Sequence, residues 1–390
     1  MGKRGVAGAI ALACAVAAVL VGTRLDGREA SPAAAVVAAP VPMAAPASAP
    51  AAPPAFGASG VQARQARLAL WQQRLARAQD TLASYEASTR YPHESRPLGE
   101  HPDQQHPFDP IADEMPLRTP GGQPAKGVRV RTTQDRVFAS GSESVRFSVR
   151  AVDDDDKPVA LLVTRALAFD LPDPRQVAGR PQVAVSFSDT GAGDGSLAAV
   201  LQPATQGFAD FAGTIRLQVY LNQGGQLGNV YFDVVYHPQV PAEWAGVREV
   251  LHDGSLDFLL KVRVQEAGRY VANARVDDAD GKPFALLSFN DELAAGEQEM
   301  RLTLFGKLVR DASPAFPLTL RDVQGFLLLP DRFPDRAMMA RRPGAVHTSR
   351  VYPAESFSTA EWRSEERSRY LTELGRDVDE AQRQVQGLTR

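Results

Sequence analysis

The chain has 390 residues, with 43 Lys and Arg against 46 Asp and Glu and a formal charge of −3. This near balance excludes the basic footprint of a nucleic-acid-binding protein, and the length predicts two to three domains. The single cysteine is Cys14, so the chain beyond it can hold no disulfide, cysteine nucleophile or cysteine-based zinc site.

Residues 1–29 carry a membrane-targeting pattern. Lys3 and Arg4 precede an uncharged apolar run from Gly5 to Gly22, and such positive charge keeps that end in the cytoplasm while the rest is translocated. A retained signal anchor, a cleaved signal peptide and lipidation at Cys14 are the alternatives. We therefore expect inner-membrane anchoring with periplasmic domains, or a secreted or periplasmic protein if the helix is cleaved.

The next two segments are predicted to be a disordered linker over residues 30–60 and an amphipathic helix over residues 61–90. The linker is almost entirely Ala, Pro, Val and Ser, a composition that cannot bury a core. In the helix, apolar residues recur at alternating spacings of three and four, the seam of a coiled coil. The residues expected to pair with another helix are Leu68, Trp71, Leu75 and Leu82.

Residues 91–125 are rich in Pro, His, Asp and Gln and show no periodicity. The helix before them must stop ahead of Pro92, because a residue that precedes proline disfavours helical geometry. A free linker rarely contains so many aromatic and charged side chains. We therefore expect an ordered loop that packs across a domain surface.

Strand patterns dominate residues 126–240 and residues 241–357. Val145, Phe147 and Val149 alternate with polar neighbours, a period of two that predicts one buried and one wet face. Similar short strands recur at intervals of about ten residues, separated by Gly- and Asn-rich turns. Each of the two ranges is therefore predicted to be an antiparallel β-sandwich domain.

An internal repeat supports two copies of one architecture. The stretch Val152–Leu162 is echoed by Val276–Leu287, with an acidic turn followed by Lys-Pro at the start of the next strand. The second turn also raises a calcium hypothesis, because clustered carboxylates suit this ion, although Asp and Gly favour ordinary hairpin turns too. The candidate calcium ligands are Asp277, Asp278 and Asp280.

Residues 358–390 are predicted to form a C-terminal helix. Ser358 and Glu361 have the spacing of a capping box, and a heptad stripe follows. The two heptad helices could pair with one another, pair between copies as a homodimer, or each pack on a sandwich face. The pairing residues expected here are Leu371, Leu374, Val378 and Val385.

The sequence shows none of the catalytic motifs with a defined spacing. It has no G-x-S-x-G, no H-E-x-x-H and no glycine-rich phosphate loop. We therefore expect a non-enzymatic binding or scaffolding protein without a cofactor, apart from calcium, whose partner is an envelope protein or a glycan. An extracytoplasmic hydrolase or carbohydrate-active enzyme with a site at the interdomain cleft is the alternative.

Five stretches carry a resemblance to a known group: Thr89–Pro92, Phe258–Val276, Asp277–Pro283, Leu293–Gly296 and Leu304–Lys307. Through them the second half resembles uncharacterised exported bacterial proteins with tandem immunoglobulin-like β-sandwich domains, and the resemblance covers about residues 85–370. It implies a fold and an extracytoplasmic location, and no catalytic residues. Together these features predict a mainly β protein. We expect two tandem antiparallel immunoglobulin-like β-sandwiches flanked by heptad-patterned helices, preceded by a membrane or signal helix and a disordered linker.

Overall fold

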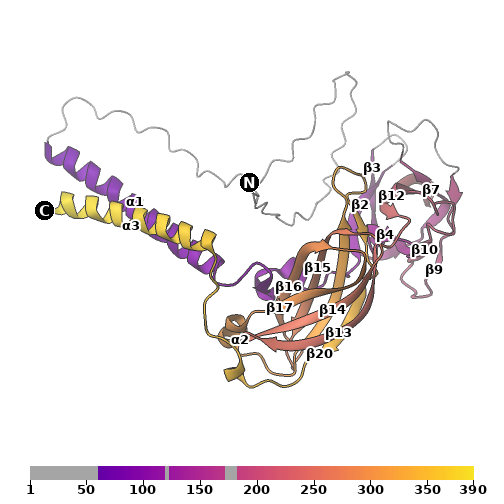
Figure 1. The fold of residues 1–390 in the computed structure, drawn as a ribbon. Helices are drawn as coiled ribbons and strands as arrows, with labels where there is room; N and C mark the ends of the chain where they lie inside the picture. Colours follow the sequence, from indigo (N-terminus) through magenta and orange to yellow (C-terminus); the bar gives the residue numbers. More distant parts are fainter. Residues whose placement is uncertain (1–59, 119–122, 172–181) are drawn as a thin grey trace, which may run out of the picture. The chain divides into compact units, whose positions relative to one another are not determined.

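The computed structural model describes residues 60–118, 123–171 and 182–390. This part of the chain is mainly β, with four sheets and three α-helices, and its strands run antiparallel apart from one parallel pair. Strands fill the middle of the described chain, and one long helix precedes them while another follows them (Figure 1). No helix within the described ranges is both long and apolar enough to cross a membrane. The predicted membrane segment, and the linker up to residue 59, lie outside those ranges.

Two sheets form the first sandwich. In one, β6 (Pro158–Val159) pairs with β5, and the other five strands follow the spatial order β2 (Ile111–Arg118), β3 (Pro124–Gln134), β5 (Val145–Val152), β10 (Leu197–Leu201) and β9 (Ser188–Asp189). The facing sheet has the order β4 (Phe138–Ser140), β12 (Gln226–His237), β11 (Gly213–Gln223), β7 (Leu162–Asp170) and β8 (Val183–Ala184), in which β4 runs parallel to β12.

Alternating residues of these strands build the first core. Along β11 the buried positions Ile215, Leu217 and Val219 alternate with half-exposed neighbours, as a strand with one wet face requires. The rings of Phe147 and Phe232 meet with their centroids 4.9 Å apart. Burying each such aromatic side chain contributes about 1.5–3 kcal/mol.

Two further sheets form the second sandwich. One has the order β1 (Ser95–Pro97), β16 (Pro283–Leu293), β15 (Gly268–Asp277), β18 (Thr319–Leu328) and β19 (Arg336–Met338), and β20 (Arg342–Thr348) also pairs with β18. The other contains β13 (Ala242–His252), β14 (Ser255–Val264) and β17 (Gly296–Leu304). A separate hydrophobic core lies between them, which includes the fully buried Phe258, Tyr270 and Leu302. The short helix α2 (Gly306–Ala312) contributes Leu308 and Val309 to this core.

The segment predicted as a Pro- and His-rich loop contains two strands, and this corrects the loop prediction. β1 pairs with β16 of the second sandwich, whereas β2 pairs with β3 of the first. β2 escapes periodicity because it is an edge strand that is exposed over most of its length. Between β1 and β2 lie two single-turn helices, η1 (Leu98–Glu100) and η2 (Pro102–Gln104).

A buried arginine fastens this segment to the second sandwich. Arg275 is fully buried in β15 and donates hydrogen bonds to the main-chain and side-chain oxygens of Gln104, at 2.7 and 2.9 Å, and to the carbonyl of Asp322 at 3.2 Å. Burial lowers the pKa of Arg275 to about 10, so the guanidinium is charged at neutral pH. Arg321 adds a hydrogen bond to the carbonyl of Gln105 at 3.0 Å.

The C-terminal helix α3 spans Glu365–Thr389. It begins after Ser358 and Glu361, so the prediction of a capping box at these two residues is wrong. Ser364 is the N-cap, and its side chain accepts a hydrogen bond from the amide of Arg367 at 3.0 Å. Ser358 lies outside the helix, where its backbone amide donates to the carbonyl of Gly254 at 2.9 Å. This bond docks the chain onto the turn between β13 and β14. The N-terminal helix α1 spans Gly60–Ser88.

Candidate functional site

A shallow polar groove of about 470 Å³ lies on the solvent-facing side of the sheet that contains β2, β3, β5 and β10. Strand register explains how it arises, since residues directly opposite each other on neighbouring strands share one face. One row across the sheet holds short side chains and the next row holds long charged ones. We call this site the polar groove; its polar lining residues are Asp113, Glu114, Arg131, Thr132, Thr133, Ser148, Arg150, Asp194 and Ser196.

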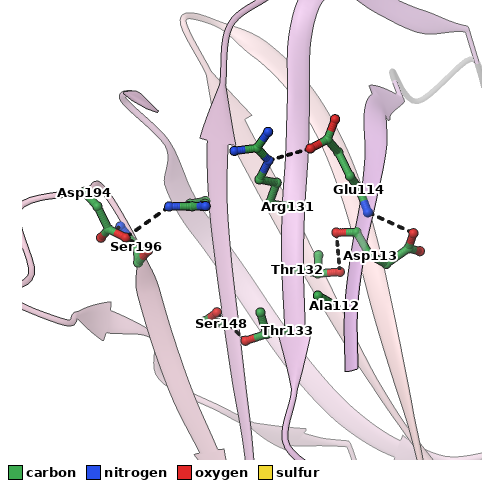
Figure 2. A pocket seen from close by; sticks show the side chains of 10 residues that line it. Ala112, Asp113, Glu114, Arg131, Thr132, Thr133, Ser148, Asp194 and Ser196 are labelled. Carbon is green, nitrogen blue, oxygen red and sulfur yellow. Dashed lines mark hydrogen bonds and ion pairs between the residues drawn. The ribbon is translucent and has the colours of Figure 1, made fainter. Parts of the chain in front are cut away.

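Short side chains form the floor of the polar groove. Ala112, Thr133, Ser148 and Ala198 lie opposite one another on four successive strands. The hydroxyls of Thr133 and Ser148 hydrogen-bond to each other at 2.6 Å. Figure 2 shows these two side chains facing each other, with Arg131 reaching toward Glu114 beside them. The hollow exists because no long side chain stands in this row.

Charged residues form the adjacent wall. Arg131 and Arg150 lie directly opposite each other on β3 and β5, an arrangement that would be destabilising without counter-charges. Glu114 and Asp156 both pair with Arg131, and Asp194 pairs with Arg150 at 3.2 Å. The two guanidinium groups are therefore held apart from each other and fixed in place by carboxylates.

The ionisation of this wall is stable at neutral pH. The hydrogen bond from Arg131 lowers the pKa of Glu114, and the charge of Arg131 lowers the pKa of Asp156. Hydrogen bonds from the hydroxyl and amide of Ser196 lower the pKa of Asp194. Glu114, Asp156 and Asp194 consequently stay ionised at neutral pH and keep their charges beside the two arginines.

The acidic turn at the edge of the groove recurs in the second sandwich. Asp153 Oδ1 accepts from the amides of Asp155 and Lys157, both at 2.9 Å. Asp278 Oδ1 accepts in the same way from the amides two and four residues later, at 3.0 and 2.9 Å. The two turns thus correspond from Asp153 to Asp278, and the second copy has a bulge after its turn, where Phe284 of β16 lies between the partners of Val276 and Asp277.

The three candidate calcium ligands have different surroundings. Asp277 pairs with Arg321 at 2.5 Å, and its Oδ1 atom is buried without a hydrogen-bond partner. Asp278 closes the turn, and Asp280 is exposed. Among the residues that the structure describes, no group of three or more His, Cys, Asp or Glu is placed to hold a metal ion. Calcium binding stays a prediction.

The heptad residues lie on the shielded faces of α1 and α3. The ring centroids of Tyr85 and Tyr370 lie 5.7 Å apart, and Arg367 donates to the hydroxyl of Thr89 at 3.2 Å, so the end of α1 meets the start of α3. No residue of α1 is buried, whereas Ala381 of α3 is 3% exposed. The predicted pairing residues are all half-buried: Leu68, Trp71, Leu75, Leu82, Leu371, Leu374, Val378 and Val385.

A second polar cluster was not predicted. Glu249 on β13 has a side chain that is only 6% exposed, and its carboxylate lies 3.0 Å from His347 Nε2. It also accepts hydrogen bonds from the amide of Arg350 at 2.8 Å and from the hydroxyl of Tyr352 at 2.9 Å. These partners lie about one hundred residues away in the sequence, so no local spacing could reveal them. The cluster ties β13 to β20 and to the segment after it.

Comparison with known proteins leaves the family open. No protein-family model matches the chain, and no curated protein matches it in sequence. A solved DUF4785 family protein from Legionella pneumophila aligns with 12% identity and a TM-score of 0.39, over 56% of this chain and 57% of that one. The native conformation of E. coli alpha-2-macroglobulin aligns with 11% identity and a TM-score of 0.26, over 61% of this chain and 18% of that one. This chain thus spans less than two thirds of either neighbour's length.

Proposed function

We propose that this protein is a non-enzymatic binding or scaffolding protein of the cell envelope, with two immunoglobulin-like sandwiches held outside the cytoplasm. The observation that carries the proposal is the polar groove. It is an open hollow on a sheet, and its two arginines are held by carboxylates. Such a surface suits recognition of a partner through preorganised hydrogen-bonding groups.

Tyr270 supports the immunoglobulin-like assignment. This tyrosine lies near the start of β15, and its hydroxyl is 2.6 Å from the carbonyl of Glu266, four residues upstream. A buried tyrosine that returns its hydroxyl to the nearby upstream backbone is a recurring feature of immunoglobulin-type sandwiches. Its pKa is raised to about 12 by burial, so the hydroxyl stays protonated and donates.

The envelope location rests on the N-terminal sequence. Lys3 and Arg4 before the apolar run favour translocation of everything that follows. The absence of cysteine beyond Cys14 is compatible with an oxidising compartment, because no thiol there could pair wrongly. Attachment through the N-terminal helix would leave both sandwiches facing the periplasm.

The hydrolase alternative has a weaker basis. A second open hollow of about 530 Å³ lies at the start of β13, beside Trp244 and Arg342. Its lining contains one carboxylate, Glu243, whereas glycoside hydrolysis uses a pair of carboxylates. Binding is therefore the function that the geometry supports better.

Two measurements on the full chain test the proposal. Alkaline phosphatase fused to the C-terminus should be active, because that reporter folds only outside the cytoplasm. A photo-crosslinking amino acid at Ser148 should capture an envelope component, whereas the same amino acid at Thr214 should not, since Thr214 lies on the opposite sheet. An inactive reporter, or equal capture at both positions, would contradict the proposal.

A further inference from the structure

The charge balance of the polar groove restricts the chemistry of its ligand. Three carboxylates line the groove, those of Asp113, Glu114 and Asp194, against the two guanidinium groups of Arg131 and Arg150. This is an excess of one negative charge. A polyanion would meet these carboxylates, and a polycation would meet the central arginine pair. The lining therefore favours a ligand without net charge.

The same lining offers many hydrogen-bonding groups. A carboxylate accepts only, a guanidinium donates only, and the hydroxyls of Thr133 and Ser148 can do both. A ligand that matches this mixture must carry groups that donate and accept equally well. Alcohol hydroxyls have this property, and sugars present them densely along a chain.

We infer that the polar groove binds an uncharged, hydroxyl-rich glycan chain, which rests on the binding function proposed above and names its ligand class. The ligand would lie across the strands, over the floor residues Thr133 and Ser148, with its hydroxyls bridging Glu114 and the two arginines. The floor row crosses four strands, and adjacent strands lie about 4.8 Å apart, so the floor extends for roughly 14 Å. This length suits an oligosaccharide better than a single sugar.

The charged wall of the polar groove is preorganised for binding a glycan. Arg131 is held by Glu114 and Asp156, and Arg150 is held by Asp194, so little side-chain order is lost when a ligand arrives. The lining contains no aromatic ring, so hydrogen bonds alone hold the ligand. We expect weak binding to each chain segment, and retention by a polymer because it supplies a high concentration of segments that can each fill the groove.

Affinity electrophoresis of the full chain tests the inference. The probes are neutral soluble glucans and an acidic polysaccharide, with purified peptidoglycan sacculi in a parallel sedimentation assay. Retardation by a neutral glucan should be nearly independent of salt, because no net charge is neutralised. The peptide stems of sacculi carry charges, so sedimentation with sacculi is compared between the wild-type protein and the groove variants. Electrophoresis with soluble glucans tests for a general polysaccharide ligand, and sedimentation with sacculi tests for the glycan strands of the cell wall.

Two groove variants and two controls locate the binding. Thr133→Gln places a long side chain on the floor and should weaken retention by roughly tenfold or more. Arg150→Gln should also weaken it and removes one wall donor without filling the floor. Thr214→Gln is the matched control, because it makes the same change on the outer face of the other sandwich sheet. Tyr231→Ala probes the exposed tyrosine of that face.

Several results would overturn the inference. The first is the absence of retention by any neutral glycan. The second is retention by the acidic polymer alone, with strong salt dependence. The third is a loss of retention in Tyr231→Ala that does not occur in Thr133→Gln. Unchanged circular dichroism and melting temperature of each variant exclude a folding defect. If glycans fail while the photo-crosslinker at Ser148 still captures an envelope protein, the glycan inference falls and the binding function stands. If no glycan binds and the photo-crosslinker at Ser148 captures nothing, the glycan inference and the binding function are both wrong.

Discussion

At the scale of single residues, Glu249 shows how the fold places a carboxylate in a nearly closed site. Burial alone would raise the pKa of Glu249, but hydrogen bonds from Arg350, Tyr352 and His347 outweigh it and lower the pKa below its ordinary value. The carboxylate thus stabilises the fold only while it is ionised. Its contribution is complete above the unfolded pKa of about 4.3 and is lost as the pH falls through the lowered folded value.

Glu249→Ala should therefore lower the free energy of unfolding by about 2–3 kcal/mol at pH 7, because Tyr352 and the amide of Arg350 lose their acceptor. Glu249→Gln keeps one acceptor oxygen and should cost about 1 kcal/mol. Urea unfolding between pH 7 and pH 3 measures both effects. The wild-type protein should lose stability toward pH 3 more steeply than either variant. Parallel pH profiles for all three proteins would show that Glu249 does not supply this dependence.

At the scale of secondary-structure elements, the terminal helices have contacts within one chain. Tyr85 meets Tyr370, and burial together with the charge of Glu366 raises the pKa of Tyr85. A pair of helices alone can cover only one side of each apolar stripe, which explains why the heptad residues are half-buried rather than buried. These contacts favour pairing of α1 with α3 over pairing between copies.

Leu374→Asp should disrupt this helix pair, because it places a charge on the shielded stripe of α3. We expect lower helical circular dichroism and faster proteolysis between residues 365 and 389, with no change in the molar mass measured by light scattering. Gln382→Asp makes a comparable change on the exposed side and should have little effect. A wild-type dimer that Leu374→Asp converts to a monomer would instead establish the homodimer.

Sequence patterns predicted some of these elements better than others. The alternation in β5 and β11 is local, so it revealed strands, and the acidic repeat revealed the equivalent turns of Asp153 and Asp278. β1 was missed because its pairing partner β16 is distant in the sequence, and β2 was missed because it is an exposed edge strand whose pattern carries no period. The polar groove depends on the register between strands, which places Thr133 opposite Ser148 and which no single strand encodes.

At the scale of the whole described chain, the two sandwiches share a small set of contacts. Ser140 of β4 is 1% exposed, and its hydroxyl accepts from the amide of Met338 in β19 at 2.9 Å. Arg336 lies over the ring of Phe138 at 4.9 Å and over the ring of Phe326 at 5.0 Å. Phe138 belongs to the first sandwich and Phe326 to the second, so one side chain contacts rings from both.

This joint should couple the unfolding of the two cores. Arg336→Ala removes two cation–π contacts, worth about 0.5–1 kcal/mol each at partly exposed sites. Ser140→Ala leaves the amide of Met338 without its acceptor and costs about 1–3 kcal/mol. In scanning calorimetry we expect one transition for the wild-type protein and two resolved transitions for the double variant.

Arg332→Ala changes an exposed arginine near the same strand and should leave the single transition intact. Two separate transitions already in the wild-type protein would mean that the contacts around Ser140 and Arg336 are too weak to join the sandwiches into one cooperative unit.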